Sequence, residues 1–232
     1  MTPTLLKDRL IRILPALLLC IAICARGEEK SAATKPAPFE KDIEAFEKAD
    51  QKKAPPKDAN LFIGSSSIVK WKTLAEDFPG VPVINRGFGG SQIPDSIRYA
   101  SRIVLPYHPK RIFLYAGDND LAAGHSPQRV FADFKTFVET VRAGQPDVPI
   151  YYISIKPSPS RAKLMDKMKE ANRLIEDWMK QGKNLTFIDI FTPMLGPDGQ
   201  PRPELFVADK LHMAKPGYEI WAAKIRPLLE SK

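Results

Sequence analysis

The sequence predicts a three-layer α/β/α domain built on a five-stranded parallel sheet. Five short apolar runs recur along the chain. They are continuous rather than alternating in polarity, as expected for parallel strands covered on both faces. Apolar stripes with helical spacing lie between these runs. Strands and helices therefore alternate, which is the order that builds a parallel sheet with helices on both sides.

Length and composition agree with one soluble globular domain. The chain has 232 residues, of which 44% are hydrophobic and 27% charged, enough for one sizeable core. The formal net charge is +8, but acidic residues alternate with the lysines, so we expect no nucleic-acid partner. An anionic envelope polymer is the alternative partner for this basic surface. Both cysteines, Cys20 and Cys24, lie near the N-terminus.

The first residues are predicted to be a signal peptide spanning residues 1–25. Three basic side chains precede an apolar run at residues 13–23. This run has the length of a signal core and is shorter than a membrane-spanning helix. We expect export to the periplasm or the extracellular space, with no membrane span after cleavage. An uncleaved membrane anchor is the alternative.

Residues 26–57 are expected to form a linker followed by an amphipathic helix. The linker is rich in Glu, Lys, Ala, Ser and Pro, a composition typical of flexible spacers. Phe39, Ile43 and Phe46 then recur at helical spacing with charged residues between them. We expect this helix to pack on the main domain, assigned to residues 58–232.

The main domain contains the alternating strands and helices. The predicted strands are residues 61–63, 81–84, 111–115, 150–155 and 185–190. Apolar stripes predict helices at residues 130–141 and 164–179, and Pro216 is a favourable first-turn residue for a last helix. Sites in parallel sheets form beyond the carboxyl ends of the strands. The segments that follow each strand are therefore where functional residues are expected.

A run of serines follows the first strand, in the sequence Gly64-Ser65-Ser66-Ser67. A serine in a glycine-containing turn between strand and helix is exposed at the end of the sheet, where a nucleophile belongs. The alternative is a helix N-cap, which serine also favours. Ile68 stands where the G-x-S-x-G motif requires glycine, which disfavours an ordinary α/β-hydrolase elbow.

Polar turns follow the second and third strands. Residues 85–91 contain three glycines in four positions, which would let backbone N–H groups approach a ligand. No Gly-Lys-Ser/Thr is present, so a nucleotide P-loop is disfavoured, and a flexible turn is the alternative. Residues 117–120 read Gly-Asp-Asn-Asp, where Asn119 either donates its amide into a site or serves a tight turn.

An aspartate and a histidine near the C-terminus are three residues apart, in Asp209-Lys210-Leu211-His212. A carboxylate on one imidazole nitrogen fixes the tautomer while the other nitrogen accepts a proton. The alternative is a surface aspartate beside a half-buried histidine. His108 precedes a strand, at the far end of the sheet, and His125 lies at the margin of the site. We therefore expect no metal site and no cofactor.

The order of these segments resembles the four blocks of the SGNH hydrolases, also called GDSL-type esterases. The resemblance covers about residues 58–230 and is carried by Gly64-Ser65-Ser66, Gly90, Asn119 and Asp209-x-x-His212. It implies the flavodoxin-like fold of that family and hydrolysis of carboxylic esters.

The resemblance also implies a role for each block. Ser66 would be the nucleophile, His212 the general base and then the general acid, and Asp209 the group that orients it. Ser66, Gly90 and Asn119 would form the oxyanion hole. The family's usual Gly-Asp-Ser reads Gly-Ser-Ser here, and we expect Ser65, in the aspartate's place, to cap the following helix.

Three further residues are expected to line the mouth of the site: Arg86, Tyr115 and Arg161. Arg161 would suit a carboxylate or phosphate on the substrate, and a solvated loop arginine is its alternative.

The substrate implied is a small-molecule or carbohydrate ester, with a carbohydrate O-acetylesterase among the options. A lysophospholipase-type lipid esterase is one alternative, and a non-catalytic envelope-binding domain on the same scaffold is another. A third is a metal-dependent phosphoesterase built on Asp118, Asp120, Asp209 and His212.

Overall fold

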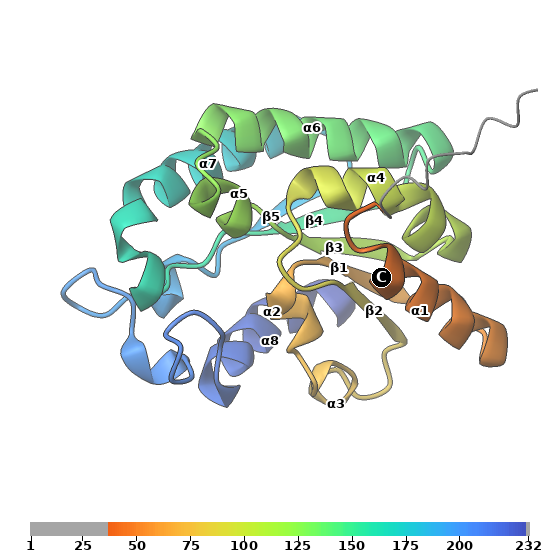
Figure 1. Ribbon diagram of the computed structural model, residues 1–232, viewed down its shortest axis with the longest axis horizontal. Coiled ribbons are helices and arrows are strands. Elements are labelled where there is room, and N and C mark those ends of the chain that lie inside the picture. The colour runs from red at the N-terminus through yellow and green to blue at the C-terminus, as the bar shows by residue number, and fades with distance from the viewer. Residues whose placement is uncertain (1–36, 231–232) are drawn as a thin grey trace, which may run out of the picture. The chain divides into compact units, whose positions relative to one another are not determined.

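The structure, a computed structural model, describes residues 37–230 and contains one five-stranded parallel sheet of order β2-β1-β3-β4-β5 (Figure 1). The strands are β1 Asn60–Gly64, β2 Val83–Gly87, β3 Arg111–Tyr115, β4 Ile150–Ile153 and β5 Leu185–Ile188. Every neighbouring pair is parallel. The predicted three-layer α/β fold is confirmed.

Helices cover both faces of the sheet (Figure 1). One face carries α1 Glu40–Lys52, α4 Ile93–Ile103, α6 Pro127–Gly144 and α7 Met165–Met179. The other carries α2 Ser66–Val69, α3 Leu74–Asp77 and α8 Lys215–Glu230, and the short α5 Asp118–Ala122 follows β3. Short 3-10 turns occur at Leu105–Tyr107, Pro159–Leu164, Thr192–Met194 and Pro203–Leu205. No described helix is both long and apolar enough to cross a membrane.

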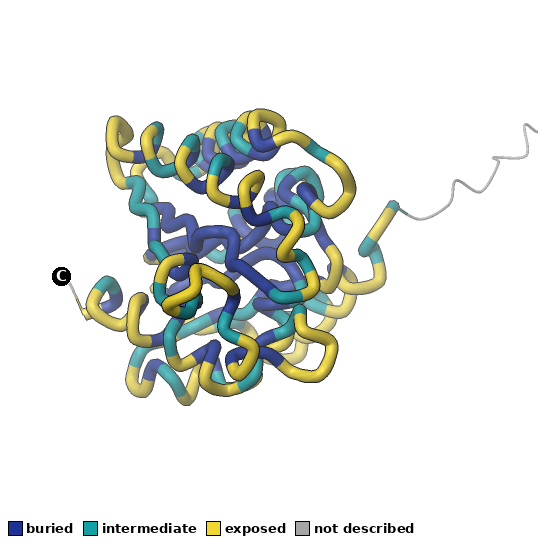
Figure 2. The backbone as a smooth tube through the Cα atoms, turned by 90° about the vertical axis from the view of Figure 1, so that its left-hand side faces the viewer, coloured by how far each residue is buried: buried dark blue, intermediate teal, exposed yellow. Residues whose placement is uncertain are grey.

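Two hydrophobic cores flank the sheet, because successive residues of each strand point to opposite faces. In β1, Leu61 and Ile63 belong to the core under α4 and α6, whereas Phe62 belongs to the core under α8. The Phe62 ring stacks on Phe113 of β3, which stacks on Tyr151 of β4, each with 4.6 Å between centroids. The three central strands, β1, β3 and β4, are accordingly buried along their whole length, whereas the edge strands β2 and β5 are partly exposed (Figure 2).

The second strand differs from its prediction. It spans Val83–Gly87 rather than residues 81–84, so Asn85 and Arg86 belong to the strand and not to the loop after it. The apolar stripes singled out above also omit α4. Its start is marked by a capping box between Gln92 and Asp95, with Pro94 between them in the first turn.

The predicted amphipathic helix is α1, which packs against α4 as part of the same compact unit. Arg102 of α4 forms ion pairs with Glu40 and Glu47 of α1, at 2.5 and 2.7 Å. Ile43 is completely buried. The predicted signal peptide and most of the predicted linker lie outside the described residues.

Candidate active site

The serine turn begins where β1 ends. Gly64 has φ 135°, and a Cβ atom there would lie 1.8 Å from the carbonyl oxygen of Tyr115 on β3. Only glycine fits this close approach of two strands. The chain then turns directly into α2, whose first residue is the half-buried Ser66. The backbone therefore holds Ser66 at the carboxyl edge of the sheet.

Both flanking elements hold α2 in place. Tyr218 of α8 donates its hydroxyl to the carbonyl oxygen of Ser67 at 2.9 Å. From β2, the side-chain amide of Asn85 donates to the carbonyl oxygen of Ile68 at 2.7 Å. The nucleophile turn is thus fixed from two sides.

The prediction that Ser65 caps α2 is wrong. Ser65 occupies the N-cap position, but its side chain makes no cap hydrogen bond. Its Oγ is buried and has no hydrogen-bond partner among the described residues. Only its backbone takes part, since its carbonyl oxygen accepts from Ile68 N and Val69 N.

The Asp209–His212 segment lies in a closed loop before α8. An isolated antiparallel bridge joins Phe206 to Met213, and Val207 N donates to the carbonyl oxygen of His212 at 2.9 Å. Lys210 adopts a left-handed conformation, with φ 56°, and its carbonyl oxygen accepts from Ser160 N at 3.1 Å. This geometry turns Asp209 and His212 toward each other.

The three predicted side chains form a hydrogen-bonded relay. His212 Nδ1 lies 2.6 Å from Asp209 Oδ2, and His212 Nε2 lies 3.0 Å from Ser66 Oγ. Asp209 Oδ1 also accepts the backbone N–H groups of Leu211 and His212, each at 2.9 Å. Hydrogen bonds from the imidazole and from these two N–H groups lower the pKa of Asp209 well below its usual value. An ionised Asp209 places the proton on Nδ1 and leaves Nε2 free to accept the serine proton.

Asn119 and the glycine loop meet beside this relay. The Asn119 amide donates to the carbonyl oxygen of Ser91 at 2.9 Å. Gly90, the residue before Ser91, is exposed and has φ 84°. The same loop is joined to β1 because Phe88 N donates to the carbonyl oxygen of Gly64 at 2.9 Å. The structure therefore ties all the residues of the expected oxyanion hole to adjoining strand ends.

Behind Asn119 lies a buried charged cluster that the sequence analysis missed in part. Asp118 Oδ2 lies 3.0 Å from both Lys156 Nζ and Arg161 Nη1, and Lys156 also donates to the Tyr115 hydroxyl at 3.1 Å. Burial alone would raise the pKa of Asp118, but Lys156 and Arg161 outweigh it, so this pKa is lowered. The available signal for Lys156 was a lysine directly after an apolar strand, at Ile155-Lys156-Pro157.

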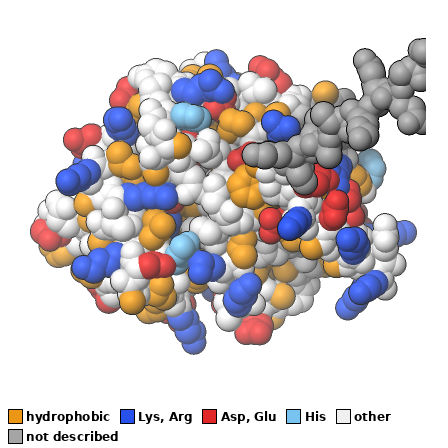
Figure 3. Space-filling view, viewed as in Figure 1, with side chains coloured by type: hydrophobic (Ala, Val, Ile, Leu, Met, Phe, Trp, Pro, Cys, Tyr) orange, Lys and Arg blue, Asp and Glu red, His pale blue; other side chains and the backbone are white. Residues whose placement is uncertain are grey.

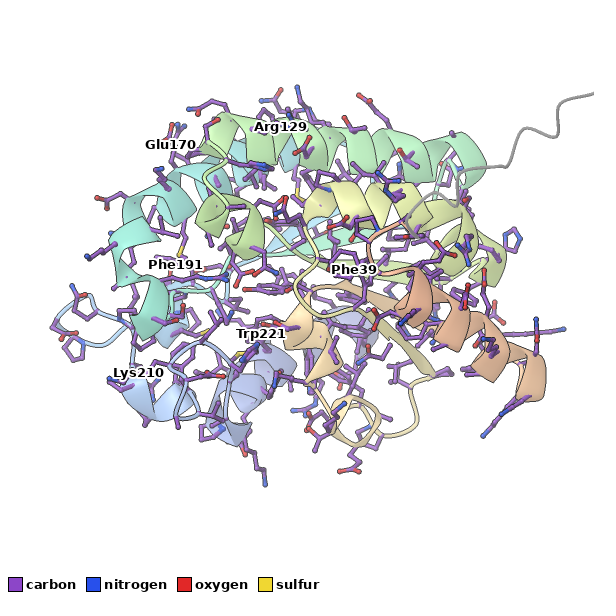
Figure 4. All side chains as sticks on the ribbon, in the orientation of Figure 1. Phe39, Arg129, Glu170, Phe191, Lys210 and Trp221 are labelled. Carbon is purple, nitrogen blue, oxygen red and sulfur yellow. The ribbon has the colours of Figure 1, made fainter. Side chains whose placement is uncertain are left out.

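Two of the three expected mouth residues lie elsewhere. Tyr115 is completely buried, and its ring lies 4.7 Å from the ring of Trp221. Trp221 points from α8 toward the sheet (Figure 4). Arg86 faces α1, where it pairs with Asp50 at 2.5 Å and donates to the Tyr107 hydroxyl at 2.7 Å. The extra strand residues set this direction, because side chains alternate along β2.

Arg161 does lie beside the expected site, since its Nη2 donates to Asn119 Oδ1 at 2.9 Å. Its guanidinium is thus engaged by the protein rather than projecting freely into solvent.

Among the described residues, Asp120, His125 and Asp133 are the group with metal-ligand geometry. Their ligand atoms lie within 4.8 Å of one another. Asp133 is already paired with Arg129 at 2.8 Å. The four residues of the phosphoesterase alternative do not form such a group: Asp118 is bound to two cations and Asp209 to His212.

Comparison with known proteins decides the family. A sequence model of the GDSL-like Lipase/Acylhydrolase family matches residues 64–220, a segment that contains every residue of the relay and of the expected oxyanion hole. The chain belongs to this family. As a GDSL-like acylhydrolase, it is a hydrolase of ester bonds. No curated protein sequence matches the chain.

Solved structures agree with the GDSL-like fold. A Streptococcus pneumonia protein provisionally named a platelet activating factor aligns with TM-score 0.72 and 20% identity, covering 82% of this chain and 92% of its own. A GDSL-like lipase from Bacteroides thetaiotaomicron aligns with TM-score 0.69 and 21% identity, covering 81% and 97%. An acetyl-xylooligosaccharide esterase variant from Geobacillus Stearmophilus aligns with TM-score 0.60 and 15% identity, covering 76% and 96%.

Proposed function

We propose that this acylhydrolase is a serine esterase in which Ser66 attacks the ester carbonyl. The observation that carries the proposal is the continuous relay from Asp209 through His212 to Ser66, with heavy-atom distances of 2.6 and 3.0 Å. Both distances are within hydrogen-bond reach, as a nucleophile and its base require.

The relay supports a two-step reaction. His212 Nε2 takes the Ser66 proton as Oγ bonds to the carbonyl carbon, and then gives that proton to the departing alcohol as the ester C–O bond breaks. Water then attacks the acyl-enzyme, with its proton passing to Nε2, and the acid leaves as the proton returns to Ser66 Oγ. Asp209 stays ionised throughout and stabilises the imidazolium.

Three donors are assigned to the oxyanion that forms in each step. These are the backbone N–H groups of Ser66 and Gly90 and the side-chain amide of Asn119. Only one of the two Asn119 Nδ2 hydrogens is needed for the bond to Ser91, so the other is free to meet a substrate oxygen. A donor of this kind is typically worth ~3 kcal/mol of transition-state stabilisation.

We assign acetyl or other short acyl esters of carbohydrate as the substrate class. Gly89, Gly90 and Asp209 at the rim are solvent-exposed, which leaves room for a bulky alcohol portion. An acetyl-xylooligosaccharide esterase shares the fold. A lysophospholipid is the second candidate, and a screen of acetylated sugars against lysophospholipids separates the two.

We further propose that the protein is exported. The basic start and the apolar run at residues 13–23 support a cleaved signal peptide. A location outside the cytoplasm would suit an enzyme that acts on esters of envelope or other polysaccharides. The intact mass of the protein recovered outside the cytoplasm tests this, because retention of residues 1–25 would contradict cleavage.

Hydrolysis of a chromogenic acetate ester tests the catalytic assignment. Ser66→Ala should abolish turnover and labelling by a serine-directed phosphonate, and His212→Ala should lower kcat steeply. Ser67→Ala, one residue further along α2, is the matched control and should keep most of the activity. Undiminished turnover in Ser66→Ala would refute the proposal, and loss of wild-type activity with a chelator would favour the metal-dependent alternative.

A further inference from the structure

The orientation of the Asn119 amide is fixed at both ends. Its Oδ1 accepts from Arg161 Nη2, and its Nδ2 donates to the carbonyl oxygen of Ser91, each at 2.9 Å. A guanidinium can only donate and a carbonyl oxygen can only accept. An amide flip would therefore break both bonds, so the donor end is held toward the glycine loop.

Arg161 is itself held by buried charges. Its Nη1 lies 3.0 Å from Asp118 Oδ2, and the same oxygen lies 3.0 Å from Lys156 Nζ. The Lys156 side chain is 1% exposed and that of Asp118 is 5% exposed. A buried lysine needs a paired carboxylate, and here one carboxylate faces two cations. The cluster thus carries one positive charge in excess, next to the Asn119 carbonyl oxygen.

We propose that Arg161 is a positioning residue for the oxyanion hole, with Asp118 and Lys156 as its support. This inference rests on the proposed esterase function. Arg161 would keep the second Nδ2 hydrogen of Asn119 aimed at the substrate oxygen. Its positive charge at Oδ1 would also polarise the amide and strengthen the N–H as a donor, as expected for linked hydrogen bonds in a low dielectric.

The geometry favours this role over direct contact with an anionic substrate. Nη2 donates to Asn119, Nη1 lies within ion-pair distance of Asp118, and the Arg161 side chain is only 17% exposed. A substrate carboxylate that bound Nη1 or Nη2 would compete with Asp118 or Asn119. The two roles also differ in kinetics, since positioning acts on kcat and substrate contact acts on KM.

Steady-state kinetics on a neutral acetate ester test the proposal in two backgrounds. In the otherwise native enzyme, Arg161→Met should lower kcat roughly 10- to 100-fold with KM nearly unchanged, a part of the loss expected for removing one oxyanion donor. In the Asn119→Ala background, the same change should lower kcat less than about 3-fold, because the group it positions is gone. Arg173→Met, on the exposed face of α7, should have no effect in either background.

Chemical rescue by added guanidinium separates a positioning role from a merely structural one, because a purely structural defect would not be repaired by the added ion. Added guanidinium should restore part of the kcat of Arg161→Ala, but not that of Arg161→Ala combined with Asn119→Ala. Arg161→Lys keeps the charge but has no fork to reach both Asp118 and Asn119, so it should fall between wild type and Arg161→Met. If Arg161→Met does not fold, Arg161→Lys in the same two backgrounds decides.

Equal losses of kcat with and without Asn119 would overturn the inference, as would a rise in KM alone. These outcomes are distinct from failure of the esterase assignment, which would appear as turnover that survives Ser66→Ala.

Discussion

The side chain of Asp209 is more exposed to water than that of His212, and this exposure limits how much Asp209 contributes to catalysis. The side chain of Asp209 is 48% exposed, against 18% for His212. Solvent can therefore screen part of the charge of Asp209. The carboxylate nevertheless keeps three hydrogen bonds, which lower its pKa and hold it ionised under mildly acidic conditions.

Replacing Asp209 by Asn should lower kcat on the order of 10²-fold. The amide cannot stabilise the imidazolium, but water can partly replace the lost charge, so the loss should be smaller than the ~10⁴-fold seen for a fully buried triad aspartate. Steady-state kinetics measure the change, with Asp166→Asn, a fully exposed aspartate, as control. A loss equal to that of Ser66→Ala would show that exposure does not weaken the contribution of Asp209.

At the residue scale, site residues could be predicted from the sequence where a reactive side chain lies directly after a strand or before the last helix. Ser66 and Asn119 follow strands, and Asp209 and His212 precede the last helix. Each segment alone had a second interpretation, and the order of the segments, which resembles that of the SGNH hydrolases, predicted that they lie together. Lys156 could not be predicted, because its partner Asp118 lies 38 positions away in the chain. The local signal, a lysine directly after an apolar run, does not show which carboxylate this lysine meets.

At the scale of elements, the short helix α5 connects the site to α4. Asn119 faces the glycine loop from this helix, and the next residue, Asp120, is completely buried. Asp120 Oδ1 accepts the backbone N–H of Ile93, the first residue of α4, at 3.0 Å. Its Oδ2 has no hydrogen-bond partner among the described groups. Burial raises the pKa of Asp120 to about 6.

This raised pKa predicts a pH-dependent gain from Asp120→Asn. The folded carboxyl binds a proton more tightly than the unfolded one, so the stability of the wild type should fall as pH rises from about 4 to about 6 and stay lower above that. Asn keeps an acceptor for Ile93 and carries no buried charge. The variant should therefore be more stable at pH 8, by on the order of 2 kcal/mol, and the gain should vanish near pH 4.

Urea unfolding of both proteins at pH 4 and pH 8 measures this difference. Asp198→Asn, at an exposed turn, is the control and should show no such dependence on pH. A variant less stable than the wild type at pH 8 would contradict a raised pKa at Asp120.

Element boundaries are where the sequence was least informative. The strand core of β2 was recognised, but its end was set three residues too early. Because of that error, Arg86 was predicted to be a loop residue facing the substrate, whereas it is a strand residue facing α1. The start of α4 does carry a local signal, the capping box of Gln92 and Asp95, which a pattern of apolar stripes does not include. The end of β2 is set by a tertiary contact, its pairing with β1, in which Gly87 lies opposite Gly64.

At the scale of the whole molecule, two features stand out: the mixed charge of the surface and the packing of α1 on the domain. Basic and acidic side chains are interspersed over the face seen in Figure 3. The most distinctive large-scale feature of the described unit is α1, which precedes the residues matched by the family model. Its Asp50 pairs with the buried Arg86, its Phe46 ring lies 5.0 Å from the same guanidinium, and its Ile43 enters the core.

Because α1 is packed in this way, the folded unit should require it. Ile43→Ala should lower the free energy of unfolding by about 2–4 kcal/mol, through lost burial and the cavity left behind. Lys41→Ala, on the exposed face of the same helix, should change it by less than about 0.5 kcal/mol. The kcat of Ile43→Ala, measured well below its melting temperature, should match the wild type, because no residue of the relay touches Ile43. A chain of residues 58–232 that unfolds at the same urea concentration as one of residues 37–232 would show instead that α1 is dispensable and that the folded unit begins after it.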